Sequence, residues 1–285
     1  MIAGSGPLLF PVAASRAKHG ARVAYVAEQA DGRIVRKFAA SLWSSPRLLL
    51  QAARYRRGFI GSAYRCGWWV TKVFGTERVE AVAITNGVKT RTIECSMLCT
   101  GFGLVPNTEI ARLFGCDLTG AAVRVDDAQQ TSVPNVYCAG EPTGIGGVDL
   151  AVAEGEIAGH AAAGNARKAG RVRGRVRRLR SYAARLDETF RLRDELKHLA
   201  APDTIVCRCE DVRMSAIDAA WGARKTKLYT RAGMGPCQGR VCGSALEFIH
   251  GWTPDHTRLP SEPALVSTLI AAGAPAAPTP EHGAR

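Results

Sequence analysis

The sequence lacks any apolar run that approaches the roughly 20 residues needed to span a bilayer. Its apolar runs are short, as at residues 48–50 and 151–153. It also lacks a charged-then-apolar leader ending in a small-residue cleavage site. We therefore expect no membrane span and a cytoplasmic, reducing location. Of the 285 residues, 46% are hydrophobic, which is enough for a folded core.

Acidic residues are scarce, because 25 Asp and Glu stand against 38 Lys and Arg and give a net charge of +13. Most of the excess lies in residues 167–193, where eleven basic residues meet only Asp187 and Glu188. This basic segment lacks interleaved aromatic side chains and any recognised nucleic-acid motif. We therefore expect a solvated face or a subunit contact, and no nucleic-acid partner.

No nucleophile stands in a recognisable arrangement with a general base. The histidines at positions 19, 160, 198 and 250 are scattered, without ligand or triad spacing. We therefore expect no catalytic residue in this chain. The nine cysteines are odd in number and unevenly clustered, which argues against a closed disulfide framework and for a local site.

Four of the cysteines form two closely spaced pairs, Cys207-x-Cys209 and Cys237-x4-Cys242, with 27 residues between the pairs. Four thiolates satisfy either zinc or an iron-sulfur cluster. Structural zinc sites usually use C-x2-C knuckles, so this spacing favours a [2Fe-2S] cluster. Buried free thiols and a zinc ribbon are the alternatives.

Glycines lie close to the second cysteine pair, because Gly233 and Gly235 precede Pro236. They let the backbone approach a cluster closely, and the proline predicts a helix start whose free amides bond sulfur. The other five cysteines lie in apolar surroundings and are predicted to be core residues. These are Cys66, Cys95, Cys99, Cys116 and Cys138.

The first thirty residues predict a βαβ nucleotide-binding unit. A strand at 1–3, a helix at 8–19 and a strand at 21–27 surround a glycine turn and end at Glu28. The turn residues are Gly4, Ser5, Gly6 and Pro7, with Leu9 in place of the third glycine of the dinucleotide fingerprint. Glu28 is placed to accept from a ribose 2′-hydroxyl, which favours NAD or another adenine nucleotide over NADP. The alternative is a vestigial unit kept for structure.

Later segments predict an α/β chain with an antiparallel insert. Helices are predicted at 41–64, 108–114, 148–164 and 167–199. Strands are predicted at 67–74, 79–85, 92–98, 123–126 and 135–139. The Asn86-Gly87 pair is the strongest hairpin-turn signal.

Two regions resemble known cofactor motifs. Residues 206–210 and 230–242 resemble the bacterioferritin-associated-ferredoxin-type [2Fe-2S] domain that is fused to amine-oxidising flavoenzymes. Residues 100–107 and 131–148 resemble the connecting segment and the C-terminal flavin motif of glutathione-reductase-like flavoproteins. The resemblance implies FAD contacts at Gly101, Gly103, Gly140, Glu141, Gly146, Gly147 and Val148. The alternative for the second motif is an ordinary glycine-rich surface loop.

Together the motifs resemble the flavin-, nucleotide- and iron-sulfur-binding subunit of opine oxidases and D-hydroxyproline dehydrogenases; hydrogen cyanide synthase has a similar subunit. The resemblance implies a hetero-oligomer, in which a separate flavoprotein subunit oxidises an amine or imino acid while this subunit passes electrons from flavin through the cluster. That family places a complete FAD-binding βαβ unit before the segment that starts here at Met1. We therefore expect an incomplete FAD site, and activity only with a partner.

The implied fold is a partial two-dinucleotide-binding-domain flavoprotein fold of glutathione-reductase type, in the α/β class, followed by a small α-rich [2Fe-2S] domain. The rival interpretation is a zinc-stapled or vestigial scaffold with a basic partner- or nucleic-acid-binding arm. The predicted domains are a Rossmann-like unit at 1–100, the C-terminal part of an FAD domain at 101–165, a basic helical connector at 166–202, the cluster domain at 203–252 and an irregular tail at 253–285.

Overall fold

A computed structural model describes residues 1–252 and 264–273 of the chain. It divides into two compact units. The N-terminal unit comprises residues 1–111 and 115–202, and the C-terminal unit comprises residues 112–114 and the described residues from 203 onward.

A four-stranded parallel sheet forms the centre of the N-terminal unit, with strand order β3-β2-β1-β7. Its strands are β1 (Ile2–Gly4), β2 (Tyr25–Glu28), β3 (Ala63–Cys66) and β7 (Cys99–Gly101). The chain leaves β1 toward β2 on one side, while β7 pairs with β1 on the other side. The glycine turn therefore lies at the point where the strand order reverses, as in doubly wound sheets. The predicted α/β class is confirmed.

Successive side chains of β1 and β2 are buried on opposite faces of this sheet. Ile2 and Val26 pack with α1 (Leu9–Lys18) and with Phe59. On the opposite face, Met1, Ala3, Tyr25 and Ala27 pack against Trp68 and against Val82 and Ile84 of a second, antiparallel sheet. Both faces are covered, which explains why these strands read as nearly continuous apolar runs.

A second, antiparallel sheet has the order β4-β5-β6. Its strands are β4 (Trp69–Phe74), β5 (Ala81–Thr85) and β6 (Thr90–Glu94). The predicted hairpin turn is confirmed, because β5 pairs with β6 across Asn86-Gly87 and Asn86 Oδ1 accepts from the amides of Val88 and Lys89. A short pair of strands, β8 (Leu118–Thr119) and β9 (Ala122–Val123), follows later in the chain.

The remaining elements before residue 203 are helical, and α4 includes residues of both units. The α-helices are α2 (Gly32–Ser41), α3 (Pro46–Arg57), α4 (Glu109–Leu113), α5 (Val148–Ala162) and α6 (Ala166–Thr189). Short 3-10 helices are η1 (Leu42–Ser44), η2 (Glu141–Thr143) and η3 (Asp194–His198).

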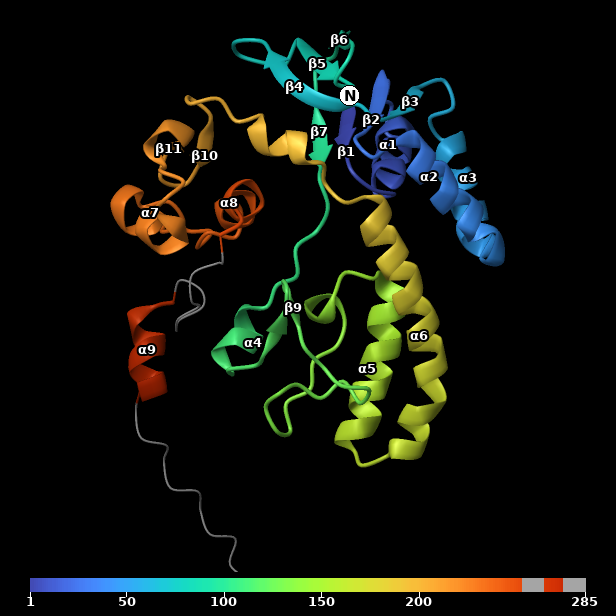
Figure 1. Ribbon diagram of the computed structural model, residues 1–285, viewed down its shortest axis with the longest axis vertical. Helices are drawn as coiled ribbons and strands as arrows, with labels where there is room; N and C mark the ends of the chain where they lie inside the picture. Colours follow the sequence, from blue (N-terminus) through green and yellow to red (C-terminus); the bar gives the residue numbers. More distant parts are fainter. Residues whose placement is uncertain (253–263, 274–285) are drawn as a thin grey trace, which may run out of the picture. The chain divides into compact units, whose positions relative to one another are not determined.

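Helices α5 and α6 run side by side (Figure 1) and share one apolar core. The α6 residues Ala169, Val176 and Ala183 are buried in it with residues of α5. A basic helical connector is predicted over residues 166–202; residues 166–189 are helical, and they also complete the core of α5. The sequence indicates this packing, because every third or fourth residue among the arginines of α6 is apolar.

The C-terminal unit contains a two-stranded antiparallel sheet of β10 (Ile205–Cys207) and β11 (Val212–Arg213). It also contains η4 (Met214–Ala216), α7 (Gly222–Thr230), α8 (Cys242–His250) and α9 (Val266–Gly273). Its small core consists of Cys207, Val212, Ala232 and Cys242, with Val206 and Ile217 against it. Two of the four clustered cysteines are therefore core residues of this unit.

Several element predictions were wrong. The helix expected over 41–64 is interrupted at Ser45 and ends at Arg57, and residues 63–66 form β3 instead. The strand expected over 135–139 is a single bridge between Gln130 and Tyr137, because Asn135 takes a left-handed conformation with φ of 62°.

Two further differences lie elsewhere in the chain. Helix α2 lies in a stretch to which no element had been assigned. Residues 266–273 of the expected irregular tail form α9, and the rest of that tail, apart from residues 264 and 265, lies outside the described residues. Within the described ranges, no helix combines the length and apolarity that crossing a membrane requires.

Candidate functional site

The four clustered cysteines line one cavity of about 360 Å³ in the C-terminal unit. Cys207 ends β10 and Cys242 begins α8, and both are buried. Cys209 is exposed in the turn after β10, and Cys237 is half-buried in the loop before α8. The chain thus brings together both predicted pairs, with Val206, Arg208 and Val241 completing the lining.

Each close contact between these sulfurs joins one cysteine from each pair. Cys209 Sγ and Cys237 Sγ are 3.6 Å apart. Cys242 is hydrogen-bonded to Cys207, and the pKa of Cys242 is raised to about 12 by burial, by Cys207 and by Cys237. Burial acts to raise the pKa of Cys237 as well, but backbone amides of residues 239–241 and the Cys209 thiol bring it below its usual value. In space the thiols therefore form two new pairs. The inner, apolar pair is Cys207 and Cys242; the outer pair is Cys209 and Cys237, in which Cys237 is stabilised as thiolate.

No group of three or more metal-ligating side chains close enough to hold a single ion occurs in the described part of the chain. The four thiols lie as two pairs around a shared cavity instead. The assignment of these cysteines as metal ligands stays a prediction.

Glycine is required beside the outer pair. A Cβ atom at Gly235 would lie 2.2 Å from Cys209 Cβ and 3.3 Å from its sulfur. Gly233 and Gly239 have φ of 84° and 80°, and a Cβ at Gly233 would lie 3.5 Å from the Cα of Gly239. The loop therefore folds closely around the thiols, because its backbone carries no side chains at these points.

The predicted helix start at Pro236 is wrong, since α8 begins at Cys242. Gln238 and Gly239 both have positive φ, which no helix start can contain. The intervening turn still aims the amides of residues 239–241 at Cys237, which is the type of contact that was expected from a helix N-terminus.

A second candidate site is the glycine turn at the end of β1. The backbone amide of Ser5 donates to Gly101 O at 2.7 Å, and that of Gly6 donates to Glu28 Oε2 at 2.8 Å. Pro7 and Leu8 then lead into α1. The turn is formed as expected, but two of its amides are bonded within the fold.

The Glu28 side chain lies beneath this turn and is 1% exposed. Its other oxygen, Oε1, accepts from the Ala30 amide at 2.9 Å. Burial raises the pKa of Glu28 to about 6, against the lowering effect of the Ala30 and Gly6 amides. Glu28 therefore holds the turn together, and its contact with a ribose stays a prediction.

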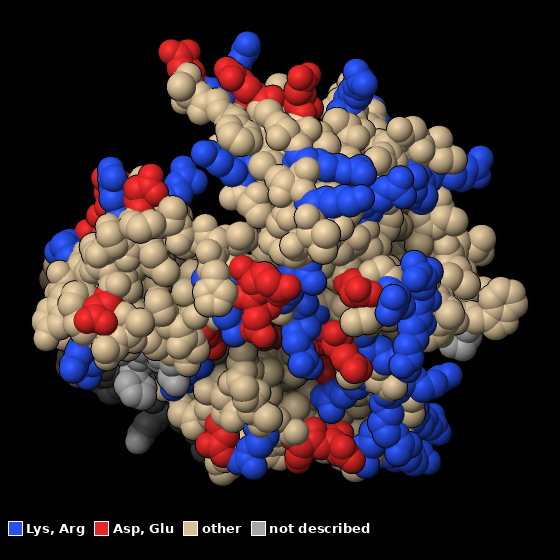
Figure 2. Space-filling model, turned by 45° about the horizontal axis from the view of Figure 1, so that its top comes forward, with Lys and Arg blue, Asp and Glu red and all other residues tan. Residues whose placement is uncertain are grey.

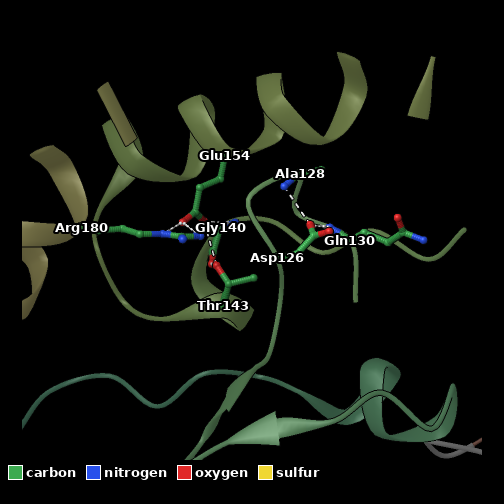
Figure 3. A network of polar contacts seen from close by, with 7 residues as sticks. All are labelled: Asp126, Ala128, Gln130, Gly140, Thr143, Glu154 and Arg180. Atoms are coloured by element: carbon green, nitrogen blue, oxygen red, sulfur yellow. Dashed lines mark hydrogen bonds and ion pairs between the residues drawn. The ribbon is translucent and has the colours of Figure 1, made fainter. Parts of the chain in front are cut away.

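The expected flavin motif is organised by a residue that the sequence pattern had not singled out. Glu154 of α5 is 1% exposed, and its Oε2 accepts from the Gly140 amide at 2.9 Å and from Thr143 Oγ1 at 2.8 Å (Figure 3). Its Oε1 accepts from Arg180 Nε of α6 at 2.9 Å, and Arg180 Nη2 is 2.8 Å away. One carboxylate thereby connects the turn, α5 and α6.

Other members of the expected flavin set occupy different surroundings. Glu141 is exposed in η2, and Gly103 lies in the extended segment after β7. Gly101 ends β7 and contacts the other glycine turn. A Cβ at Gly146 would lie 2.2 Å from Leu150 Cδ2, so this glycine serves close packing. Gly147 caps α5 with φ of 82°, and Val148, which follows it, is 75% exposed.

The sequence contained a signal for Glu154. Leu150, Ala153 and Ile157 are buried at helical spacing, and Glu154 falls on the same stripe. An acid on a buried stripe requires a partner, which here is Arg180. No comparable signal marked Gln29, which is also 1% exposed and directly follows Glu28.

Arginines of the basic segment are mostly solvated. On α6, Arg171, Arg173, Arg175, Arg177 and Arg178 are exposed. Figure 2 shows Lys and Arg side chains gathered densely along the right side of the view. Arg173 and Arg177 also line a cavity of about 270 Å³ together with Arg180, Gln129 and Asp127.

The five remaining cysteines do not join the four-cysteine cavity. Cys95 and Cys99, the first residue of β7, pack against the apolar clusters on the two sides of the parallel sheet. Cys116 is buried, and Cys66 and Cys138 are half-buried with pKa values raised by burial.

Comparison with known proteins identifies one matching family model, described as pyridine nucleotide-disulphide oxidoreductase, over residues 61–155. The chain is 32% identical over 274 residues to hydrogen cyanide synthase subunit HcnB of Pseudomonas aeruginosa, covering 85% of this chain and 58% of the relative. It is 30% identical over 288 residues to an opine oxidase subunit of Rhizobium meliloti, covering 90% of this chain and 61% of the relative. The chain thus spans about three fifths of the length of these relatives.

Among solved structures, the L-proline dehydrogenase from P. horikoshii is similar in fold, with a TM-score of 0.58 and 19% sequence identity. The similarity covers 78% of this chain and 47% of that chain. It supports the predicted α/β fold with two dinucleotide-binding-type domains.

Proposed function

We propose that this chain is an electron-transferring subunit of a flavin-dependent oxidoreductase. The observation that carries the proposal is the cavity lined by Cys207, Cys209, Cys237 and Cys242. In this proposal the four thiolates hold a [2Fe-2S] cluster, which supplies a one-electron path for a two-electron donor. The relatives support it, because they are named as subunits of an oxidase and of a synthase.

The sulfur geometry fits a metal with two cysteine ligands from different motifs. Two sulfurs bonded to one tetrahedral metal at about 2.3 Å lie about 3.8 Å apart. Cys209 Sγ and Cys237 Sγ are 3.6 Å apart, while Cys207 and Cys242 form the second hydrogen-bonded pair. In this proposal Cys209 and Cys237 would hold one iron, and Cys207 and Cys242 would hold the other.

In this proposal the residues around the four cysteines position the cluster and set its reduction potential. Amides of residues 239–241 stabilise Cys237 as thiolate, and the glycine at 235 leaves room for the outer pair. The buried inner pair lies in the apolar core of the unit, while Cys209 is exposed. This arrangement offers an exposed edge for electron exchange and a protected interior that limits the entry of water.

The other cofactors and the partner belong to the same proposal. Residues 4–7 with Glu28 would contact NAD or another adenine nucleotide. The residues that would contact FAD are Gly101, Gly103, Gly140, Glu141, Gly146, Gly147 and Val148. The residues that oxidise the donor would lie on a partner flavoprotein subunit, and the relative named opine oxidase supports an amine or imino-acid donor. This chain would then be inactive without that partner.

Purification of the full chain without oxygen tests the cluster directly. Visible absorption between about 400 and 550 nm that bleaches with dithionite, and about two irons per chain, is the expected result. Cys237→Ser should remove both signals. Cys138→Ser is the matched control, because Cys138 is half-buried in the other unit, and it should leave both unchanged.

A colourless protein with one zinc per chain would overturn the proposal in favour of a zinc-stapled scaffold. FAD content should also be measured, first on this chain alone and then after co-expression with a partner flavoprotein subunit. An increase in bound FAD on co-expression is the outcome expected if the flavin site is completed by another chain.

A further inference from the structure

The segment that follows α6 lies across the glycine turn of the first βαβ unit. We call residues 190–193 the docked segment. Ser5 Oγ donates to Phe190 O at 2.7 Å, and Gln29 Nε2 donates to Arg191 O at 3.0 Å. Gln29 Oε1 accepts from the Arg193 amide at 3.2 Å. Two carbonyls and one amide of the docked segment are thus bonded to the residues that directly follow β1 and β2.

Side chains fix the two ends of the docked segment. The Phe190 ring lies over Gly6, where a Cβ would be 3.9 Å from its Cγ, and packs edge-to-face on Phe38 at 5.6 Å. The Arg193 guanidinium stacks on the Trp69 ring at 3.9 Å from its centroid. A cation over an indole face is the strongest arrangement of this kind. The docked segment is therefore held by packing as well as by hydrogen bonds.

The docked segment lies where this type of sheet places a nucleotide. In open parallel sheets, dinucleotides bind beyond the carboxyl ends of the strands, next to the glycine turn and the end of the second strand. Ser5 and Gln29 hold these two positions and are 6% and 1% exposed. Their side-chain donors are already bonded to the docked segment and to each other, with Gln29 Nε2 2.8 Å from Ser5 Oγ.

We propose that the docked segment is the resident occupant of this nucleotide edge, and that a dinucleotide binds only when the segment is displaced. Displacement frees Ser5 Oγ, Gln29 and the surface of Gly6, and it moves the end of α6. An apparent affinity equals the intrinsic affinity multiplied by the fraction of open molecules. The wild-type chain should therefore bind dinucleotides weakly. This inference goes beyond the electron-transfer function and does not depend on the cysteine cavity.

The test is titration of the full chain with NADH, followed by fluorescence or calorimetry. The variant Phe190→Ala/Arg193→Ala removes both side-chain contacts and leaves the glycine turn unchanged. It should bind NADH at least about tenfold more tightly than wild type, which corresponds to an open fraction that rises about tenfold. Arg191→Ala is the matched control, because it removes an exposed arginine of the same segment, and it should bind like wild type.

Equal NADH affinity in wild type and the double variant, or absence of binding in both, would overturn the proposal. Hydrogen exchange on the wild-type chain gives a second test that needs no substitution. Saturating NADH should accelerate exchange in peptides covering residues 188–196. Binding that leaves or increases protection there would show that the segment is not displaced. Iron content and visible absorption, measured in parallel, should not differ between the variants, so a failure here is separable from a failure of the cluster assignment.

Discussion

The backbone carbonyl oxygen of Gly101 occupies the position that a side chain at Gly4 would need. A Cβ at Gly4 would lie 1.8 Å from this oxygen. The same oxygen accepts the Ser5 amide at 2.7 Å, so the contact joins β1 to β7 directly at the glycine turn. The first glycine of the fingerprint is thus required by strand packing, whether or not a nucleotide binds.

Gly4→Ala should therefore destabilise the N-terminal unit strongly. The added methyl would force β1 and β7 apart, and we expect a loss of about 3 kcal/mol or more in the free energy of unfolding. Denaturant unfolding followed by circular dichroism measures this loss. Gly155→Ala is the control, because Gly155 is exposed within α5 with nothing within 4 Å, and it should stabilise by about 0.5–1 kcal/mol. Equal stability of Gly4→Ala and wild type would contradict the packing argument.

The first βαβ unit could be predicted because its signals are local. Two glycines, a small-residue helix and an alternating strand occur within thirty residues. β3 and β7 were not predicted as strands of this sheet. Each has four residues or fewer, and its pairing with β2 or β1 depends on chain segments far away in the sequence. Short parallel strands carry too few residues for a periodic pattern to identify them.

For the candidate sites, the sequence shows which residues belong together more readily than how they are arranged in space. Spacing grouped the four cysteines, and the structure places them around one cavity. Spacing does not say which sulfurs are neighbours, because the pairing of Cys209 with Cys237 arises only when β10 and the later loop fold together. The contact of Phe190 with Ser5 spans 185 residues, and no local pattern records it.

Arg180 compensates the buried carboxylate of Glu154, and its removal should be costly. Arg180→Met leaves that charge buried without its partner, and we expect a loss of about 3 kcal/mol in unfolding free energy. The double variant Glu154→Gln/Arg180→Met removes the stranded charge and keeps an acceptor for the Gly140 amide, so it should recover part of the loss. Arg173→Met removes an exposed arginine of the same helix and should change stability by less than about 0.5 kcal/mol. If the two arginine variants are equally stable, the ion pair contributes nothing.

Glu28 should make the stability of the N-terminal unit depend on pH. Burial raises its pKa from 4.5 to about 6 in the folded chain. The folded state therefore binds the proton more tightly, and the associated stability of about 2 kcal/mol is present below about pH 4.5 and lost as pH rises through about 6. Glutamine does not titrate. When pH falls from about 7 to about 4, the unfolding free energy of wild type should thus rise by about 2 kcal/mol relative to that of Glu28→Gln. A difference that stays constant over this range would show that Glu28 has the same pKa in both states.

Gly235 tests whether the close fold of the cysteine loop is needed to hold a cluster. A methyl group at this position would lie 2.2 Å from Cys209 Cβ, so Gly235→Ala must move either the loop or the outer thiol pair. Because the cavity depends on both, we expect iron content and visible absorption to fall by more than half, while the helix content of the N-terminal unit is kept. Gly243→Ala is the matched control, since Gly243 follows Cys242 in α8 and a Cβ there has nothing within 4 Å. Full iron loading of Gly235→Ala would show that the thiols bind their ligand in an arrangement other than the one described.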